Sequence, residues 1–129
     1  FIIFFKKGVV LVYLGNHNQQ YSNELSFRIT CKQMVYCNFG WRLSKGDLNS
    51  DQHDDLIISS PFAHTCDDQC GLVAILLAKN FQKIPTEIDL KDLDWTLQGN
   101  MQYEWFGFST RVKLGLLVVG APQSRICSK

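Results

Sequence analysis

The chain has 129 residues, with 13 basic and 12 acidic side chains and a formal net charge of +1. So balanced a charge offers no basic face for nucleic acid and no polybasic segment for anionic lipid. The length and the 46% hydrophobic content suffice for a packed core, whereas the apolar runs are too short to span a bilayer. The chain begins without a methionine, inside an apparent strand, so we expect it to be a piece of a longer protein.

Short apolar runs bounded by turn residues predict a protein built from strands. Several of these runs are rich in the β-branched and aromatic residues that favour strands. The strand candidates are residues 7–14, 24–36, 56–58, 71–77, 93–97 and 116–122. Polar connections lie between them, of which the longest, residues 78–91, is broken by Pro85.

Residues 47–55 carry oxygen-bearing side chains in an alternating order. Asp47, Asn49 and Asp51 stand two positions apart, and Asp55 follows at loop position nine. Because alternate positions of a tightly curled loop point inward, their oxygens can converge on one point. Oxygen ligands suit calcium, and the backbone carbonyl of His53, at position seven, would add a fifth. The pattern therefore predicts a structural calcium site, with a solvated acidic turn as the alternative.

The acidic loop does not fit an EF-hand. An EF-hand has a bidentate glutamate at position twelve and a helix on each side of its loop. Position twelve, counted from Asp47, is Ile58, which has no ligand atom in its side chain. The run after the loop, Leu56–Ile58, is short and apolar and is stopped by Ser59-Ser60-Pro61. It reads as a buried strand, so we expect the loop to join two strands.

The order of Phe39-Gly40, acidic loop, apolar strand and small-residue stop resembles the FG-GAP repeat. That repeat builds the seven-bladed propellers of integrin alpha chains and of glycosylphosphatidylinositol-specific phospholipase D. The family loop runs Asp-x-Asp/Asn-x-Asp/Asn-Gly-x-x-Asp, which matches the four acidic and amide positions named above. This sequence departs from it at Gln52, where the family has a glycine that favours positive φ. The Ser59-Ser60-Pro61 stop also replaces Gly-Ala-Pro.

The same landmarks recur once. Gly8 to Gly71 is 63 positions, Phe39 to Phe106 is 67, and Pro61 to Pro122 is 61. A unit of this length with about four strands is typical of a propeller blade. The second copy has a short link near residues 113–115 in place of the acidic loop, so only the first copy is expected to bind the ion.

The resemblance and the repeat together predict an all-β fold of about two blades. Each blade would be an antiparallel four-stranded sheet of a seven-bladed FG-GAP propeller. Residues 1–14 would be the last strands of a preceding blade, and residues 15–77 the repeat with the calcium loop. Residues 78–129 would be a second, truncated repeat without that loop. An isolated pair of blades exposes sheet edges, so the remaining blades of a longer chain are expected partners.

Residues 94–99 and 103–108 are similar to the propeller of the phospholipase D more than to an integrin. The resemblance then implies a non-catalytic segment of a secreted, extracellular hydrolase that releases glycosylphosphatidylinositol-anchored proteins. Its catalytic site would lie in a separate amino-terminal domain with zinc, and no cluster of that kind occurs in this sequence. Two alternatives are a ligand-binding segment of an integrin alpha-like adhesion receptor and a calcium-loop scaffold with no enzyme attached.

The five cysteines bear on the extracellular location that the resemblance implies, since cysteines pair in secreted proteins. Cys66 and Cys70 flank a short polar segment and are the leading pair, and Cys31 with Cys37 is a second candidate. The remaining cysteine would stay free or pair outside the segment. His64, Cys66 and Cys70 lack the fourth ligand and the spacing of a zinc site.

Overall fold

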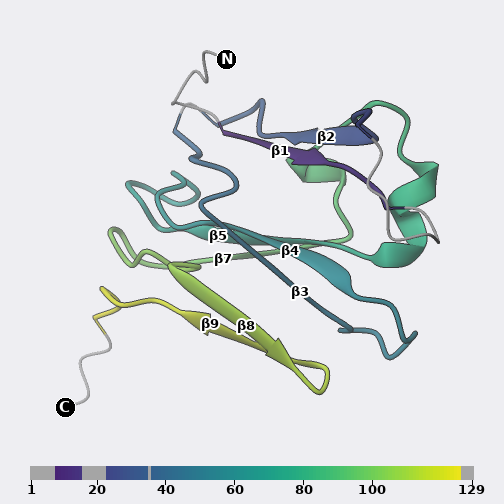
Figure 1. The fold of residues 1–129 in the computed structure, drawn as a ribbon. Helices are drawn as coiled ribbons and strands as arrows, with labels where there is room; N and C mark the ends of the chain where they lie inside the picture. Colours follow the sequence, from purple (N-terminus) through teal and green to yellow (C-terminus); the bar gives the residue numbers. More distant parts are fainter. Residues whose placement is uncertain (1–7, 16–22, 35, 126–129) are drawn as a thin grey trace.

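The computed structural model describes residues 8–15, 23–34 and 36–125, and its regular structure is mostly strand (Figure 1). Residues 1–7, 16–22, 35 and 126–129, and the predictions that concern them, lie outside the described residues. The strands are β1 (Val9–Val12), β2 (Phe27–Thr30), β3 (Arg42–Gly46), β4 (Asp55–Ser60), β5 (Leu72–Leu76), β6 (Glu87–Asp89), β7 (Trp95–Gln98), β8 (Ser109–Lys113) and β9 (Leu116–Gly120). Two 3-10 helices, η1 (Ala78–Lys83) and η2 (Leu90–Asp92), flank β6.

The strands form three sheets stacked as successive layers (Figure 1). The middle sheet has the order β3-β4-β5-β7 and is antiparallel throughout. On one side lies the sheet β1-β2-β6, and on the other the antiparallel hairpin β8-β9. The middle sheet has the four antiparallel strands of a propeller blade, which confirms the predicted all-β class.

The two central strands of the middle sheet, β4 and β5, are buried on both faces, and this explains their uninterrupted hydrophobic runs. Ile58 and Ala74 face a core shared with β1 and β2, whereas Ile57 and Val73 face a second core shared with the β8-β9 hairpin. All four side chains are fully buried, and burying each isoleucine contributes about 1.5–3 kcal/mol. Strands buried on both faces do not show a polar alternation, so β4 and β5 read as continuous apolar runs.

The two repeats make the same turn after their Phe-Gly pairs. The amides of Gly40 and of the next residue both donate to the Ser59 carbonyl, at 3.2 and 3.1 Å. The amides of Gly107 and of the next residue both donate to the Gly120 carbonyl, at 3.1 and 3.2 Å. The turn at Phe106 therefore repeats the turn at Phe39, in agreement with the spacing of the sequence landmarks.

Glycines lie at equivalent close backbone contacts between consecutive layers. Gly8 and Gly71 have φ of +69° and +90°, which favours glycine over any other residue. A Cβ atom on Gly8 would overlap the backbone of Phe39, and one on Gly71 would overlap the backbone of Phe106. Each Phe-Gly turn thus packs directly on the glycine that starts a strand of the layer before it.

Residues 78–91, predicted as a polar connection, contain more regular structure than expected. Within them β6 pairs in parallel with β2, and the Arg28 amide donates to the Thr86 carbonyl at 3.0 Å. Glu87 forms ion pairs with Arg28, at 3.3 Å, and with Lys32. The segment therefore extends the preceding sheet. Because β7 follows residue 78, the middle sheet takes strands from both predicted repeats, and the sequence division at residues 14 and 77 stays a prediction.

Candidate calcium loop and the opposite end of the blade

The acidic loop joins β3 to β4 at one end of the middle sheet. The two strands pair down to Gly46 and Asp55, which face each other across the loop. Ile58, at position twelve, lies in β4 between Leu43 and Ala74 and is fully buried. The loop is therefore flanked by strands, as predicted, and its ninth position is held at the start of a buried strand.

Side-chain oxygens of the first and third loop positions accept hydrogen bonds from the same backbone amide. The Asp51 amide donates to Asp47 Oδ1 at 3.2 Å and to Asn49 Oδ1 at 3.1 Å. The Gln52 amide donates to Asp47 Oδ2 at 2.9 Å, and the His53 amide donates to Asp51 Oδ1 at 2.9 Å. These bonds fold the side chains of Asp47, Asn49 and Asp51 back onto the backbone amides of the loop.

Two residues of the loop adopt the left-handed conformation. Ser50 has φ of +62° and Gln52 has φ of +67°. Gln52 occupies the position where the FG-GAP loop has glycine, so the turn keeps the glycine-type conformation with a side chain attached. For a residue with a Cβ atom this conformation costs about 1–2 kcal/mol.

Asp55 closes the loop from a fully buried position. Its carboxylate accepts the Leu48 amide and the Ala78 amide, each at 2.9 Å. It therefore ties the hairpin to the start of η1. Its neighbour Asp54 is exposed and pairs instead with Lys45 at 2.8 Å.

The loop's donor set fits a hard cation in its chemistry. Asp47, Asn49, Asp51 and Asp55 offer only oxygen ligands, as does the carbonyl of His53. A hydrogen bond from the Asn49 amide, with that of the His53 amide, holds the pKa of Asp51 below its ordinary value, so this carboxylate is charged at neutral pH. Across the described ranges, no three His, Cys, Asp or Glu side chains are grouped so that they could hold a metal ion.

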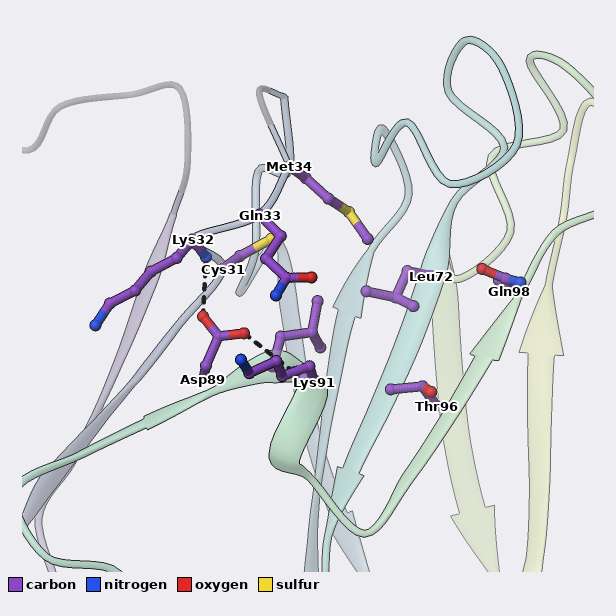
Figure 2. Close-up of a pocket in the computed structure, with 10 residues that line it drawn as sticks. Cys31, Lys32, Gln33, Met34, Leu72, Asp89, Lys91, Thr96 and Gln98 are labelled. Atoms are coloured by element: carbon purple, nitrogen blue, oxygen red, sulfur yellow. Dashed lines mark hydrogen bonds between the residues drawn. The ribbon is translucent and has the colours of Figure 1, made fainter.

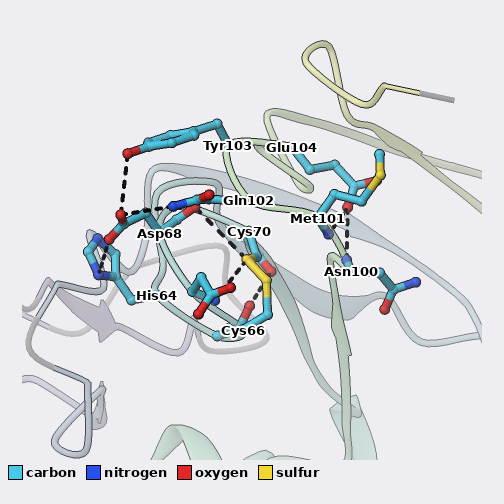
Figure 3. The surroundings of a disulfide bond; sticks show 12 residues. His64, Cys66, Asp68, Cys70, Asn100, Met101, Gln102, Tyr103 and Glu104 are labelled. Atoms are coloured by element: carbon cyan, nitrogen blue, oxygen red, sulfur yellow. Dashed lines mark hydrogen bonds and ion pairs between the residues drawn. A yellow bond between two sulfur atoms is a disulfide. The ribbon is translucent and has the colours of Figure 1, made fainter. Parts of the chain in front are cut away.

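Both candidate disulfides are present at the opposite end of the sheet. Cys66 and Cys70 are bonded with their Cα atoms 6.0 Å apart (Figure 3), and Cys31 and Cys37 with theirs 6.5 Å apart. The paired sulfurs cannot serve as zinc ligands. His64 lies beside Asp68, with 3.5 Å between Nδ1 and Oδ1.

An aromatic cluster joins the middle sheet to the next hairpin. Trp41 meets Phe62 edge-on at 5.0 Å between centroids, and Phe62 meets Trp105 edge-on at 5.5 Å. Trp105 stacks on Phe108 at 6.0 Å, and its indole N–H donates to Gln69 Oε1 at 2.8 Å. Such contacts stabilise packing between layers, and no periodic signal in the sequence brings these four rings together.

A small cavity of about 130 Å³ lies between the preceding sheet and the middle sheet (Figure 2). Cys31, Met34, Leu72 and Leu90 supply its apolar walls. Asp89 lines one side and accepts the Lys32 amide at 3.0 Å. Sequence reasoning missed this cavity because it depends on the placement of η2, which no sequence pattern predicted.

Among the described residues, no helix is long and apolar enough to cross a membrane. Residues 39–73 match the family model described as FG-GAP repeat. The chain is 35% identical over 127 residues to phosphatidylinositol-glycan-specific phospholipase D of Homo sapiens, a match that covers 95% of this chain. It is 35% identical over 119 residues to the protein of that name in Rattus norvegicus and 32% identical over 124 residues to that in Dictyostelium discoideum, each covering 89% of this chain.

The chain spans only 15%, 14% and 13% of the length of these three relatives. Residues 39–73, which match the FG-GAP model, contain the Phe39 turn, the acidic loop and β4, and they end within β5. The chain therefore contains an FG-GAP repeat, the unit that forms β-propeller blades, and is homologous to part of phosphatidylinositol-glycan-specific phospholipase D.

Proposed function

We propose that the chain is a non-catalytic, calcium-binding propeller segment of a secreted phospholipase D that acts on phosphatidylinositol-glycan. The observation that carries the calcium assignment is the meeting of Asp47 Oδ1 and Asn49 Oδ1 at one amide nitrogen. Two side-chain oxygens that accept from the same amide lie near each other, as the ligands of one ion must. Asp51 and Asp55 would add carboxylate oxygens, and His53 its carbonyl.

The role of the ion in this proposal is structural. When bound, calcium supplies positive charge that offsets the repulsion among three carboxylates. The loop residues then hold the β3-β4 hairpin, and the hydrogen bond from the Ala78 amide to Asp55 connects this hairpin to the start of η1. This structural role needs no neighbouring substrate pocket, because the ligands act on the hairpin itself.

The secreted location is supported by two disulfides, which form and persist in oxidising compartments. The phospholipase activity would belong to another part of the longer chain, and this segment would contribute propeller structure alone. The similarity extends along nearly the whole segment to relatives that carry this activity in their name, which favours the phospholipase over the adhesion receptor.

Isothermal calorimetry tests the calcium assignment directly. Wild-type chain titrated with calcium should show one site with a dissociation constant of about 10⁻⁴ to 10⁻³ M, the range of extracellular modules. Magnesium should bind more weakly, because it retains its water and demands stricter geometry. The absence of calcium heat at millimolar concentrations would overturn the assignment.

The phospholipase assignment needs a separate assay on the longest protein that contains this segment. That protein should release a glycosylphosphatidylinositol-anchored reporter from vesicles into solution, whereas the 129-residue chain should release none. Release by the short chain would show that the segment is catalytic. A lack of release by the long protein would remove the phospholipase proposal while leaving the calcium assignment intact.

A further inference from the structure

Two tyrosines flank an imidazole and a carboxylate at the end of the blade opposite the acidic loop. The ring centroids of Tyr36 and His64 lie 5.2 Å apart. The Tyr103 hydroxyl donates to Asp68 Oδ2 at 3.3 Å, and Gln102 Nε2 donates to the same oxygen at 3.1 Å (Figure 3). We name these five residues, Tyr36, His64, Asp68, Gln102 and Tyr103, the tyrosine cluster.

The tyrosine cluster is held in place by its backbone and by the two disulfides. The His64 amide donates to the Tyr36 carbonyl at 3.2 Å, and the Tyr103 amide donates to the Asp68 carbonyl at 2.8 Å. Tyr36 lies within the loop closed by Cys31–Cys37, and Asp68 within that closed by Cys66–Cys70. A surface fixed in this way loses little conformational entropy when it binds a ligand.

The two tyrosines are equivalent in the repeat and remain accessible. Tyr36 and Tyr103 are 67 positions apart, the same spacing as Phe39 and Phe106. Their exposed fractions are 46% and 47%, and the Asp68 side chain is 48% exposed. Tyr103 also has φ of +60°, which is unfavourable for a residue with a bulky side chain. Strained backbone conformations of this kind cluster at binding sites.

We propose that the tyrosine cluster binds a neutral sugar residue. A pyranose has faces of C–H groups that pack on aromatic rings, and its hydroxyls donate to carboxylate oxygens with free lone pairs. The Asp68 charge at the centre of the cluster disfavours phosphate and other anions. The cluster has five side chains, whereas a stable protein interface uses about 20–30 residues a side. Its size therefore suits a small ligand better than a protein partner.

The chemistry of Tyr103 supports the same use of the surface. The Asp68 charge and the hydrogen bond between them raise the pKa of Tyr103 above its ordinary value. Its hydroxyl therefore stays protonated at neutral pH and continues to orient Asp68 through their hydrogen bond. The ring of Tyr103 then remains positioned for a ligand, and Asp68 Oδ1, which lies 3.5 Å from His64 Nδ1, can accept a further hydrogen bond from a hydroxyl. The cluster is separate from the acidic loop, so its binding does not depend on the proposed calcium site.

Saturation-transfer NMR on the folded chain tests the proposal with maltotriose, mannotriose and triacetylchitotriose as probes. At least one should bind saturably with a dissociation constant of about 1 mM. Tyr103→Ala and Tyr36→Ala should each weaken that binding by about tenfold, since each removes a stacking face. Tyr13→Ala is the matched control, because Tyr13 is 46% exposed outside the cluster, and it should leave binding unchanged.

Failure of wild type to bind any of the three probes would overturn the proposal. An equal loss of sugar binding in Tyr13→Ala would also overturn it. The proposal would likewise fail if no sugar bound and the protein instead bound neutral phosphatidylcholine vesicles, with Tyr103→Ala abolishing that binding. Asp68→Asn and Tyr103→Phe serve if an alanine variant fails to fold. Asp68→Asn should weaken binding, whereas Tyr103→Phe, which keeps the ring, should retain most of it, and the reverse order would contradict the assignment. Repeating the titration in EDTA should change nothing.

Discussion

Gly71→Ala is expected to destabilise the protein through the close approach of two layers. Gly71 has φ of +90°, and a Cβ atom there would overlap the backbone of Phe106. The backbone conformation alone costs alanine about 1–2 kcal/mol. Displacing the Phe106 turn adds a further cost of about 1–3 kcal/mol, typical of overpacking. We therefore expect a loss of about 2–5 kcal/mol, a large part of an ordinary domain's stability.

Gly115→Ala separates the two contributions. Gly115 also has positive φ, at +75°, but no heavy atom lies within 4 Å of where its Cβ would be. This variant should lose only the conformational part, about 1–2 kcal/mol. Urea denaturation of wild type and both variants at 25 °C measures the two losses. Equal losses in the two variants would refute the packing of the Phe106 turn on Gly71.

Two further predictions concern the disulfide and the β6 ion pairs. Replacing Cys66 and Cys70 together by alanine should lower the free energy of unfolding by about 2 kcal/mol, as the short loop they close implies; urea denaturation with no loss would contradict it. The Lys32 hydrogen bond holds the pKa of Glu87 below its ordinary value of 4.5. The associated stabilisation is therefore present above pH 4.5 and is lost as the pH falls through the lower folded pKa. Lys32→Met should raise that pKa in a carboxyl NMR titration, and an unchanged pKa would count against the ion pair.

The sequence was most informative where local pattern and burial agree. Ile57 and Ile58 face opposite cores, so the run that contains them is apolar throughout and predicts a buried strand. The repeated Phe-Gly landmarks correspond to equivalent turns because each places a glycine amide on a carbonyl in the second strand of the hairpin that follows. The conformation of Gln52 was likewise foreseeable, because the turn requires positive φ whatever residue occupies it.

Features that depend on distant partners could not be predicted in this way. The strand β6 has three residues and follows Pro85, and it exists because Glu87 and its neighbours pair with β2 almost sixty positions earlier. The tyrosine cluster similarly requires loops from three parts of the chain to meet. For the acidic loop, the sequence predicted its place between two strands, and the calcium ion and its ligands remain a proposal.

The thermal stability of the folded chain in calcium and in EDTA tests the central claim most directly. At calcium concentrations of roughly ten to a hundred times the dissociation constant, binding adds about 1.4–2.7 kcal/mol of stability. Wild type should therefore melt about 5 °C or more higher in calcium than in EDTA. Asp51→Ala should lose this difference, whereas Asp54→Ala, whose carboxylate pairs outward with Lys45, should keep it. Identical melting of wild type in calcium and EDTA, or an undiminished calcium effect in Asp51→Ala, would contradict the account.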